Sequence, residues 1–152
     1  MAGGAPLGQG GEASRIIGID PGLVDTGYGA LDVCGGRARL VEAGLIRTTS
    51  AATIEVRLKE IFEGVLSILT EYRPATVIVE DLYTSYRHPR TAVLMGHARG
   101  VILLAASTRG LEVVPYPPAR VKKALVGTGT ASKRQIQRMV QVRLGLERLP
   151  EP

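Results

Sequence analysis

Cysteine, tryptophan and long apolar runs are scarce in this 152-residue chain. It contains one cysteine, no tryptophan and one phenylalanine. The single cysteine, Cys34, excludes an internal disulfide and, with only two histidines, leaves no plausible zinc site. Such cysteine usage suits a reducing compartment, so we expect a cytoplasmic protein. The longest apolar run near the middle, residues 101–106, is far shorter than the roughly 20 residues of a membrane span.

The N-terminal segment also lacks a recognisable targeting pattern. Residues 1–14 are rich in glycine and alanine and show no basic stretch followed by an apolar one, so they do not resemble a signal peptide. We expect a disordered tail over 1–14. The remaining residues, 15–152, have the length of one domain with a substantial core.

The charge is distributed unevenly along the chain. Residues 1–80 carry seven Lys/Arg against ten Asp/Glu, a net −3, whereas residues 81–152 carry twelve against four, a net +8. A basic surface beside an acidic cluster suits a polyanion that is bound by Lys/Arg and cut at metal ions held by carboxylates. A solvated basic face without function is the alternative that charge alone leaves open.

Two apolar stretches that each end in a carboxylate dominate the sequence. Residues 16–19 run into Asp20 and a Pro-Gly turn, and residues 75–79 run into Glu80. Both stretches are typical of buried strands that present their last residue at the edge of a sheet. Strands are expected at 16–20, 26–33, 38–48, 76–80 and 111–116. Helices are expected from about residue 54 to before Pro74 (capped by Ser50 or Thr53), and at 91–108, 117–125 and 133–144 (capped by Ser132).

The order of these elements predicts an α/β fold with a mixed sheet. Short connections make the first three strands an antiparallel meander, and the helix that ends before Pro74 is long enough to return strand 76–80 parallel to strand 16–20. If those two strands are neighbours, sheet growth reverses between them. Open α/β sheets place their sites at such a switch point, so Asp20 and Glu80 should meet there.

Paired carboxylates at one sheet edge can hold a divalent ion. Mg²⁺ uses few protein ligands and shares phosphate oxygens with its substrate, and two-metal sites clamp both oxygens of a displacement. Two ions normally need more than two carboxylates. Asp25, Asp32 and Asp81 are possible further ligands. Asp25 and Asp32 are, however, interpreted as turn and surface residues, and Asp81 should point away from Glu80 because strand side chains alternate.

Several motifs in order resemble the RuvC family of Holliday junction resolvases. They are Ile16–Gly22 with Thr26–Gly29, then Val77–Glu80, then Val121–Gly129 with Ala131–Lys133. The first motif alone is weak, but the blocks together, at these spacings, are specific and span about residues 15–146. The resemblance implies a ribonuclease H-like fold with a five-stranded sheet, a homodimer, and Mg²⁺-dependent symmetric nicking of four-way DNA junctions.

Residue by residue, the resemblance assigns roles at five positions. Asp20 and Glu80 match catalytic, metal-binding acids; Lys122 and Lys133 match basic residues that face DNA; and Tyr83 matches an aromatic residue that stacks on bases at the junction. The resemblance also implies two Mg²⁺ ions per subunit, with Mn²⁺ as a substitute, and a branch-migration helicase partner of the RuvA and RuvB type.

The resemblance further implies a C-terminal helix with an acidic pair that completes the metal site. This sequence ends at Pro152, where that helix would begin, and Glu147 and Glu151 lack its spacing. We therefore expect the 152-residue chain to cut poorly, as an incomplete enzyme or as a junction-binding protein without catalysis. Two other interpretations are a nucleotide-binding module of the actin and sugar-kinase type, which would need a second lobe, and the YqgF-like family of the same core, against which the Lys122/Lys133 block argues.

Overall fold

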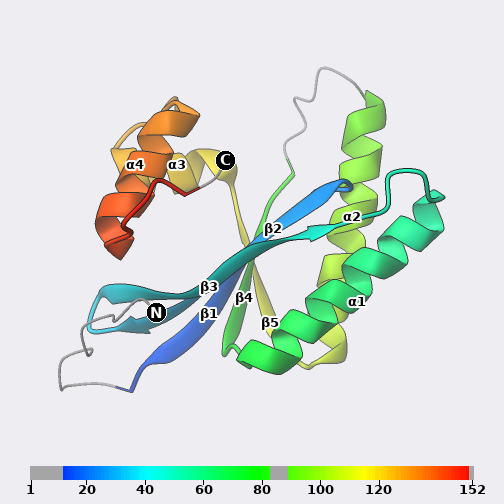
Figure 1. Cartoon of the computed structure of the whole chain (residues 1–152), viewed down its shortest axis with the longest axis horizontal. Coiled ribbons are helices and arrows are strands. Elements are labelled where there is room, and N and C mark those ends of the chain that lie inside the picture. The colour runs from blue at the N-terminus through cyan, green and yellow to red at the C-terminus, as the bar shows by residue number, and fades with distance from the viewer. Residues whose placement is uncertain (1–11, 83–88, 151–152) are drawn as a thin grey trace.

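A computed structural model describes residues 12–82 and 89–150. Within these ranges the chain forms five strands and four helices (Figure 1). In chain order they are β1 (Ser14–Asp20), β2 (Asp25–Cys34), β3 (Arg37–Arg47), α1 (Ile54–Tyr72), β4 (Thr76–Glu80), α2 (Pro89–Thr108), β5 (Glu112–Tyr116), α3 (Pro118–Val126) and α4 (Lys133–Leu144).

The strands form one mixed sheet in the order β3-β2-β1-β4-β5. The pairs β1–β2 and β2–β3 are antiparallel, whereas β1–β4 and β4–β5 are parallel. The predicted meander and the predicted neighbourhood of strands 1 and 4 are both confirmed. This is the ribonuclease H-like arrangement, with its switch point between β1 and β4.

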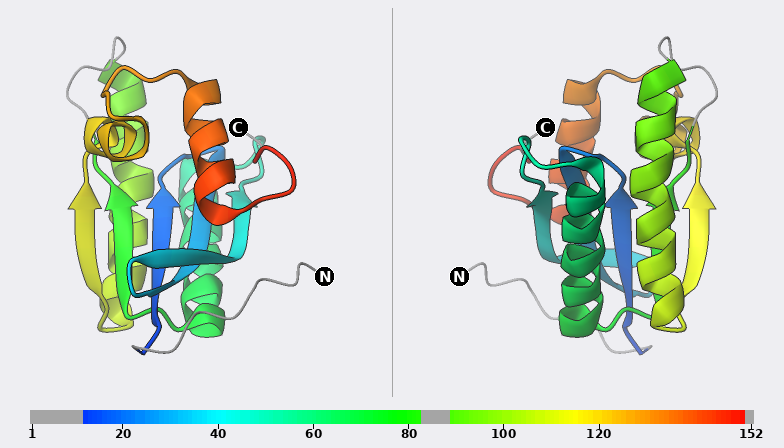
Figure 2. Two further views of the ribbon diagram at one scale, coloured as in Figure 1. Left: turned by 90° about the vertical axis from the view of Figure 1, so that its left-hand side faces the viewer. Right: turned by 90° about the vertical axis from the view of Figure 1, so that its right-hand side faces the viewer.

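The two faces of the sheet are covered differently. Helices α1 and α2 lie side by side over one face, and α3 and α4 lie on the other, towards the carboxyl ends of the parallel strands (Figure 2). The alternation of strand side chains sends every second residue of β1 and β4 into the α1/α2 layer. The largest fully buried side chains of this core are Ile17, Ile61, Val65, Val77, Val79 and Ile102.

Glycines allow a tight turn in the β2–β3 hairpin and close packing of α1 on the sheet. Gly35 and Gly36 both have positive φ, 55° and 75°, which lets the β2–β3 hairpin close in two residues. At Gly64 of α1, a Cβ atom would lie 2.8 Å from the Ile46 side chain of β3. Any larger residue at position 64 would push α1 away from the sheet.

Helix α2 is long and apolar enough to span a membrane by length and composition alone. Its small residues Ala98, Ala105 and Ala106 are instead fully buried against the protein, together with Ile102. Because the core helices of globular domains can have the same length and composition, these two properties of α2 are weak evidence for a membrane span.

Some element boundaries differ from those predicted. Strand β1 begins at Ser14, inside the segment expected to be a tail, and α2 begins at Pro89 rather than residue 91. Residues 1–11 and Tyr83, one of the predicted DNA-binding residues, lie outside the described residues. The Ser132 cap is confirmed as a capping box, in which Ser132 and Gln135 each accept a hydrogen bond from the other's backbone N–H.

The interpretation of Asp32 as a surface residue is wrong. Asp32 is 7% exposed and lies at the end of the sheet opposite to Asp20. Its carboxylate accepts hydrogen bonds from Arg15 at 2.8 and 3.0 Å and from Arg39 at 2.9 Å. These two guanidinium groups compensate for the burial of the charge, and Arg15 holds the pKa of Asp32 below its usual value.

We expect Asp32→Asn to lower the free energy of unfolding by about 2 kcal/mol at neutral pH, because two guanidinium groups lose their anion. The pKa of Asp32 is lower in the folded than in the unfolded protein, so its contribution is present above the ordinary aspartate pKa of about 4 and is lost as the pH falls through the folded value. Urea denaturation at pH 7 and at successively lower pH should therefore show the unfolding free energies of the wild type and of Asp32→Asn becoming equal. Asp25→Asn is the matched control, since the exposed Asp25–Arg47 pair should contribute less than about 1 kcal/mol. A constant difference down to low pH would contradict this account.

Candidate active site

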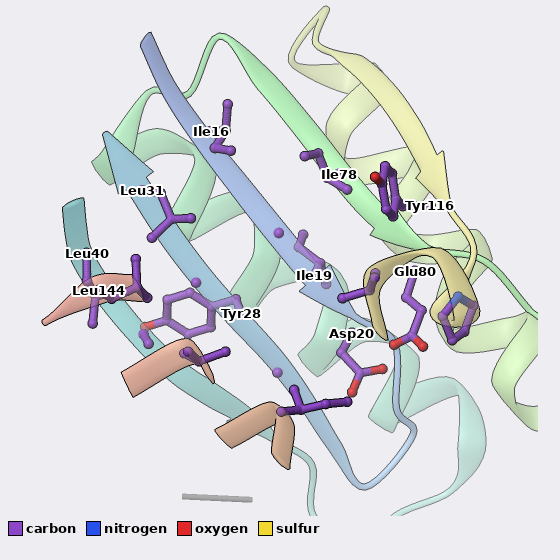
Figure 3. A pocket seen from close by; sticks show the side chains of 18 of the residues that line it. Ile16, Ile19, Asp20, Tyr28, Leu31, Leu40, Ile78, Glu80, Tyr116 and Leu144 are labelled. Atoms are coloured by element: carbon purple, nitrogen blue, oxygen red, sulfur yellow. The ribbon is translucent and has the colours of Figure 1, made fainter. Parts of the chain in front are cut away.

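Asp20 and Glu80 meet at the carboxyl ends of the two central parallel strands. The β1–β4 pairing proceeds in register to Ile19 and Val79, and each carboxylate residue is the next one along its strand. Both side chains therefore project from the same face of the sheet, opposite to the α1/α2 layer. Figure 3 shows the two carboxylates side by side. The predicted juxtaposition is confirmed, while the catalytic role of the two residues stays a prediction.

A hydrogen-bonded turn fixes the end of β1 behind Asp20. The Thr26 hydroxyl, fully buried, donates to the Gly22 carbonyl at 2.7 Å and accepts from the Gly22 N–H at 3.4 Å. A second cross-link comes from α1 and from the residue after β3, because Arg57 and Thr48 both donate to the Leu23 carbonyl, at 3.0 and 2.7 Å. The loop after Asp20 is thus held at Gly22 and Leu23, which keeps the carboxylate in a defined position.

The two carboxylates have different environments. Asp20 is exposed, whereas Glu80 is half-buried. Burial raises the pKa of Glu80 to about 7, aided by the hydrogen bond and the negative charge of Asp20, and the nearby Lys122 opposes this increase. Near neutral pH Glu80 is therefore only partly ionised, and a cation between the carboxylates would relieve the same repulsion.

The acids lie at one end of an open, mainly apolar pocket between the sheet and helices α3 and α4. Its volume is about 670 Å³. Gly18 and Gly29, paired across β1 and β2, form part of its floor, and a Cβ atom at either position would meet nothing within 4 Å. Among its other lining residues are Tyr28, Leu31, Leu40, Ile78, Tyr116, Val121, Lys122, Ile136, Val140 and Leu144 (Figure 3).

The two predicted basic residues are placed differently. Lys122 of α3 lines this pocket together with Asp20 and Glu80. Lys133 is the exposed first residue of α4, and it does not line the pocket. The structure therefore brings Lys122 to the carboxylates and leaves Lys133 on the surface at the start of α4.

The other candidate acids stand apart from the pair. Asp81 does not line the pocket, and its carboxylate forms an ion pair with Arg99 of α2 at 3.3 Å, as the alternation of β4 predicts. Arg99 also donates to the Glu80 carbonyl at 3.3 Å, so it ties the end of β4 to α2. Asp25 is the exposed first residue of β2 and pairs with Arg47.

The donor set at this edge fits a hard cation. Two adjacent carboxylates are the ligands that Mg²⁺ prefers, with water and phosphate oxygens filling its other positions. Within residues 12–82 and 89–150, no group of three or more His, Cys, Asp or Glu side chains could hold a metal ion. Asp20 and Glu80 therefore fit one ion, and a second would need further ligands.

The sequence analysis missed Tyr116, which lines the pocket, and Arg120, which contacts the Tyr116 ring from α3. Tyr116 ends β5 beside Glu80, and Arg120 of α3 lies over its ring with the guanidinium carbon 5.3 Å from the ring centroid. The sequence did offer a signal for both residues. It places a tyrosine at the last position of a predicted strand, followed by a proline-initiated helix with basic residues.

Comparisons with known proteins agree with the fold. The family model described as crossover junction endodeoxyribonuclease RuvC matches residues 16–152. The RuvC of Rhodopirellula baltica is 46% identical over 142 residues, covering 93% of this chain and 80% of that protein. The RuvC of Heliobacterium modesticaldum is 46% identical over 137 residues, covering 90% of this chain and 84% of that protein.

Solved structures give the same result. The Thermus thermophilus RuvC in complex with a Holliday junction substrate has a TM-score of 0.85 and 36% identity, covering 91% of this chain and 84% of that chain. The yeast mitochondrial Holliday junction resolvase Ydc2, with a TM-score of 0.63 and 10% identity, shares the fold alone. The actin-like, sugar-kinase-like and YqgF-like interpretations are not favoured by these matches. The chain belongs to the RuvC family of crossover junction endodeoxyribonucleases, a family of metal-dependent nucleases.

Proposed function

We propose that this protein binds four-way DNA junctions as a dimer and nicks two strands symmetrically, with Asp20 and Glu80 holding Mg²⁺ at each site. The observation that supports this most strongly is the pair of carboxylates that continues the β1–β4 register onto the open face of the sheet. When bound, Mg²⁺ supplies charge neutralisation at a phosphate and lowers the pKa of a water molecule. Mn²⁺ should substitute.

The protein's own groups have three tasks in this proposal. Asp20 and Glu80 bind the cation and orient it towards the open pocket. Lys122 places a positive charge beside them, where it attracts a DNA phosphate and, in the unliganded protein, favours the ionised form of Glu80. Arg99 keeps the end of β4 in place through the Glu80 carbonyl.

Two ions per subunit would need ligands beyond this pair. The curated relatives are longer than the region they share with this chain, which covers 80–84% of their length in the first matches. We propose that the further acids come from a helix of the type implied by the resemblance, so that the 152-residue polypeptide nicks junctions weakly and a version extended by such a helix nicks them efficiently. Equal, strong Mg²⁺-dependent nicking by both versions would show that described residues complete the site.

We propose that DNA binding uses Lys122 and Lys133, and that Tyr83 stacks on bases at the junction. Replacing either lysine by alanine should weaken junction binding and reduce the salt dependence of log Kd by about 0.9 for each phosphate that is no longer neutralised. Gel-shift titrations of a four-way junction at several salt concentrations measure both the affinity and its salt dependence. Equal affinity for the junction and for a linear duplex of the same length would overturn the proposed substrate.

We propose that α2 forms the dimer interface. Its outward face carries Val93 and Leu104, which are 57% and 54% exposed, with the exposed Gly100 between them at helical spacing. Large exposed apolar side chains in line on a long apolar helix mark a protein interface. A twofold axis would place two identical sites on two equivalent strands.

The dimer is tested by placing a charge on this face. Leu104→Glu should weaken dimerisation about a hundredfold, because two carboxylates would be buried at the seam. Sedimentation velocity over a concentration series measures the shift. Val142→Glu on α4, where Val142 is 74% exposed, is the matched control and should leave the dimer intact. A wild-type monomer at all concentrations would contradict the proposal.

The remaining expectations concern cellular context. We propose a cytoplasmic location, on the basis of the cysteine usage, and cooperation with a branch-migration helicase of the RuvA and RuvB type, on the basis of the family.

A further inference from the structure

Arg120 belongs to α3, the helix whose Pro118, Val121 and Lys122 line the pocket of the carboxylate pair, and its side chain is held against the Tyr116 ring. Its guanidinium carbon lies 5.3 Å from the centre of the Tyr116 ring, within the range of a cation–π contact. Pro117 caps α3 and Pro118 is its first residue, and both restrict the backbone between the two side chains. The Arg120 N–H donates to the Pro117 carbonyl at 2.9 Å, which fixes the turn that carries the arginine.

Tyr116 connects this arginine to the site. It is the β5 partner of Glu80 in the parallel register, so both side chains project from the same face of the sheet. The Asp81 N–H donates to the Tyr116 carbonyl at 3.0 Å and holds the two strand ends together. Figure 3 shows the Tyr116 ring on the same face as Glu80, and both residues line the pocket that Lys122 also lines.

The charge of Arg120 is not neutralised within the described part of the chain. None of the ion pairs among residues 12–82 and 89–150 includes it, and its side chain is exposed. An aromatic face orients a guanidinium group and leaves its N–H donors available for an acceptor. The planar fork of donors matches the oxygens of a phosphate.

We propose that Arg120, oriented by Tyr116, binds a backbone phosphate of the DNA strand that lies at Asp20 and Glu80. This assignment rests on the proposed function and adds a DNA-binding residue to it. Lys122 and Arg120 would then contact the strand from the α3 side of the site, with Tyr116 as a positioning residue behind the arginine.

The test is a salt-dependence series on Arg120 variants. Arg120→Ala should lower the affinity for a four-way junction about tenfold near 0.1 M salt and reduce the slope of log Kd against log salt by about 0.9, the value for one phosphate. Arg120→Lys should restore the slope, because the charge is kept. Arg37→Ala is the control: Arg37 is exposed in the β2–β3 hairpin, at the other end of the sheet, and its replacement changes net charge equally without altering the slope.

Variants of Tyr116 separate orientation from charge. Tyr116→Phe keeps the aromatic face and should bind as the wild type does. Tyr116→Leu should lower the affinity about threefold while leaving the salt slope unchanged, because it removes the ring that orients the guanidinium but not the charge. Thermal melts confirm that each variant is folded.

The outcomes distinguish this inference from the proposed function. If Arg120→Ala keeps the wild-type slope and affinity while Lys122→Ala weakens binding, Arg120 does not contact DNA and the proposed function stands. If the wild type itself shows no preference for a junction over a duplex, the proposed function fails. An equal change of slope in Arg120→Ala and Arg37→Ala would show general charge attraction and would also overturn the inference.

Discussion

Asp20→Asn is expected to reduce junction nicking by about 10³-fold or more, while junction affinity stays equal or increases. Removing one of two carboxylates removes the main attraction for the cation, and several kcal/mol of transition-state stabilisation depend on that ion. Binding follows a different course, since loss of a negative charge beside a phosphate lowers repulsion. The separation of the two effects is the signature of a catalytic acid rather than a structural one.

The assay should use the chain extended by the acidic helix proposed above. Nicking of a fixed four-way junction is measured under single-turnover conditions, and binding is measured with Ca²⁺ in place of Mg²⁺. Asp25→Asn is the matched control, because Asp25 is an exposed aspartate at the start of β2, outside the pocket. A variant that loses binding and nicking together would indicate that Asp20 supports the fold of the turn and not the chemistry.

Glu80→Gln is expected to stabilise the metal-free protein by about 2 kcal/mol at pH 8. Burial beside Asp20 raises the pKa of Glu80 to about 7 in the folded protein, above its ordinary value. A carboxyl group whose pKa is raised on folding favours the folded state below the ordinary pKa, near 4.5, and this contribution is lost as the pH rises through about 7. The wild type should therefore lose stability from about pH 5 to pH 8, and the glutamine variant should not.

Divalent ions should make the wild type more stable than Glu80→Gln at pH 8. Mg²⁺ binds the ionised pair and not the unfolded chain, so it should stabilise the wild type and leave Glu80→Gln almost unaffected. Urea denaturation at pH 5 and pH 8, with and without Mg²⁺, gives the free energy of unfolding of each protein under the four conditions. Glu112→Gln, an exposed glutamate on β5, serves as the control. Parallel pH profiles for wild type and Glu80→Gln would mean that Glu80 is ionised in the folded protein at all these pH values.

The sheet could be predicted because its local patterns agree with one another. Apolar runs ending in Asp20 and Glu80, short connections between the first strands, and one long helix before β4 leave few arrangements of the strands. The register of β1 against β4 follows from the same alternation, and it places the two acids together. The resemblance to a known family then supplied their expected chemistry.

The features that were not predicted depend on how side chains of different strands and helices meet, which no pattern within one element reveals. The burial of Asp32 requires Arg15 and Arg39, which reach it from neighbouring strands, and no local pattern distinguishes it from a surface aspartate. The contact between Arg120 and Tyr116 depends on the angle between β5 and α3 across two prolines. Lys122 and Lys133 belong to one sequence block, but separate helices carry them to different places.

Mn²⁺ binding to the 152-residue protein, followed by electron paramagnetic resonance, tests most directly the claim that Asp20 and Glu80 form one cation site. We expect one ion per chain at pH 8, about tenfold or more weaker binding in both Asp20→Asn and Glu80→Gln, and unchanged binding in Glu112→Gln. Wild-type affinity in either Asp20→Asn or Glu80→Gln would contradict the account, because the ion would then be held elsewhere.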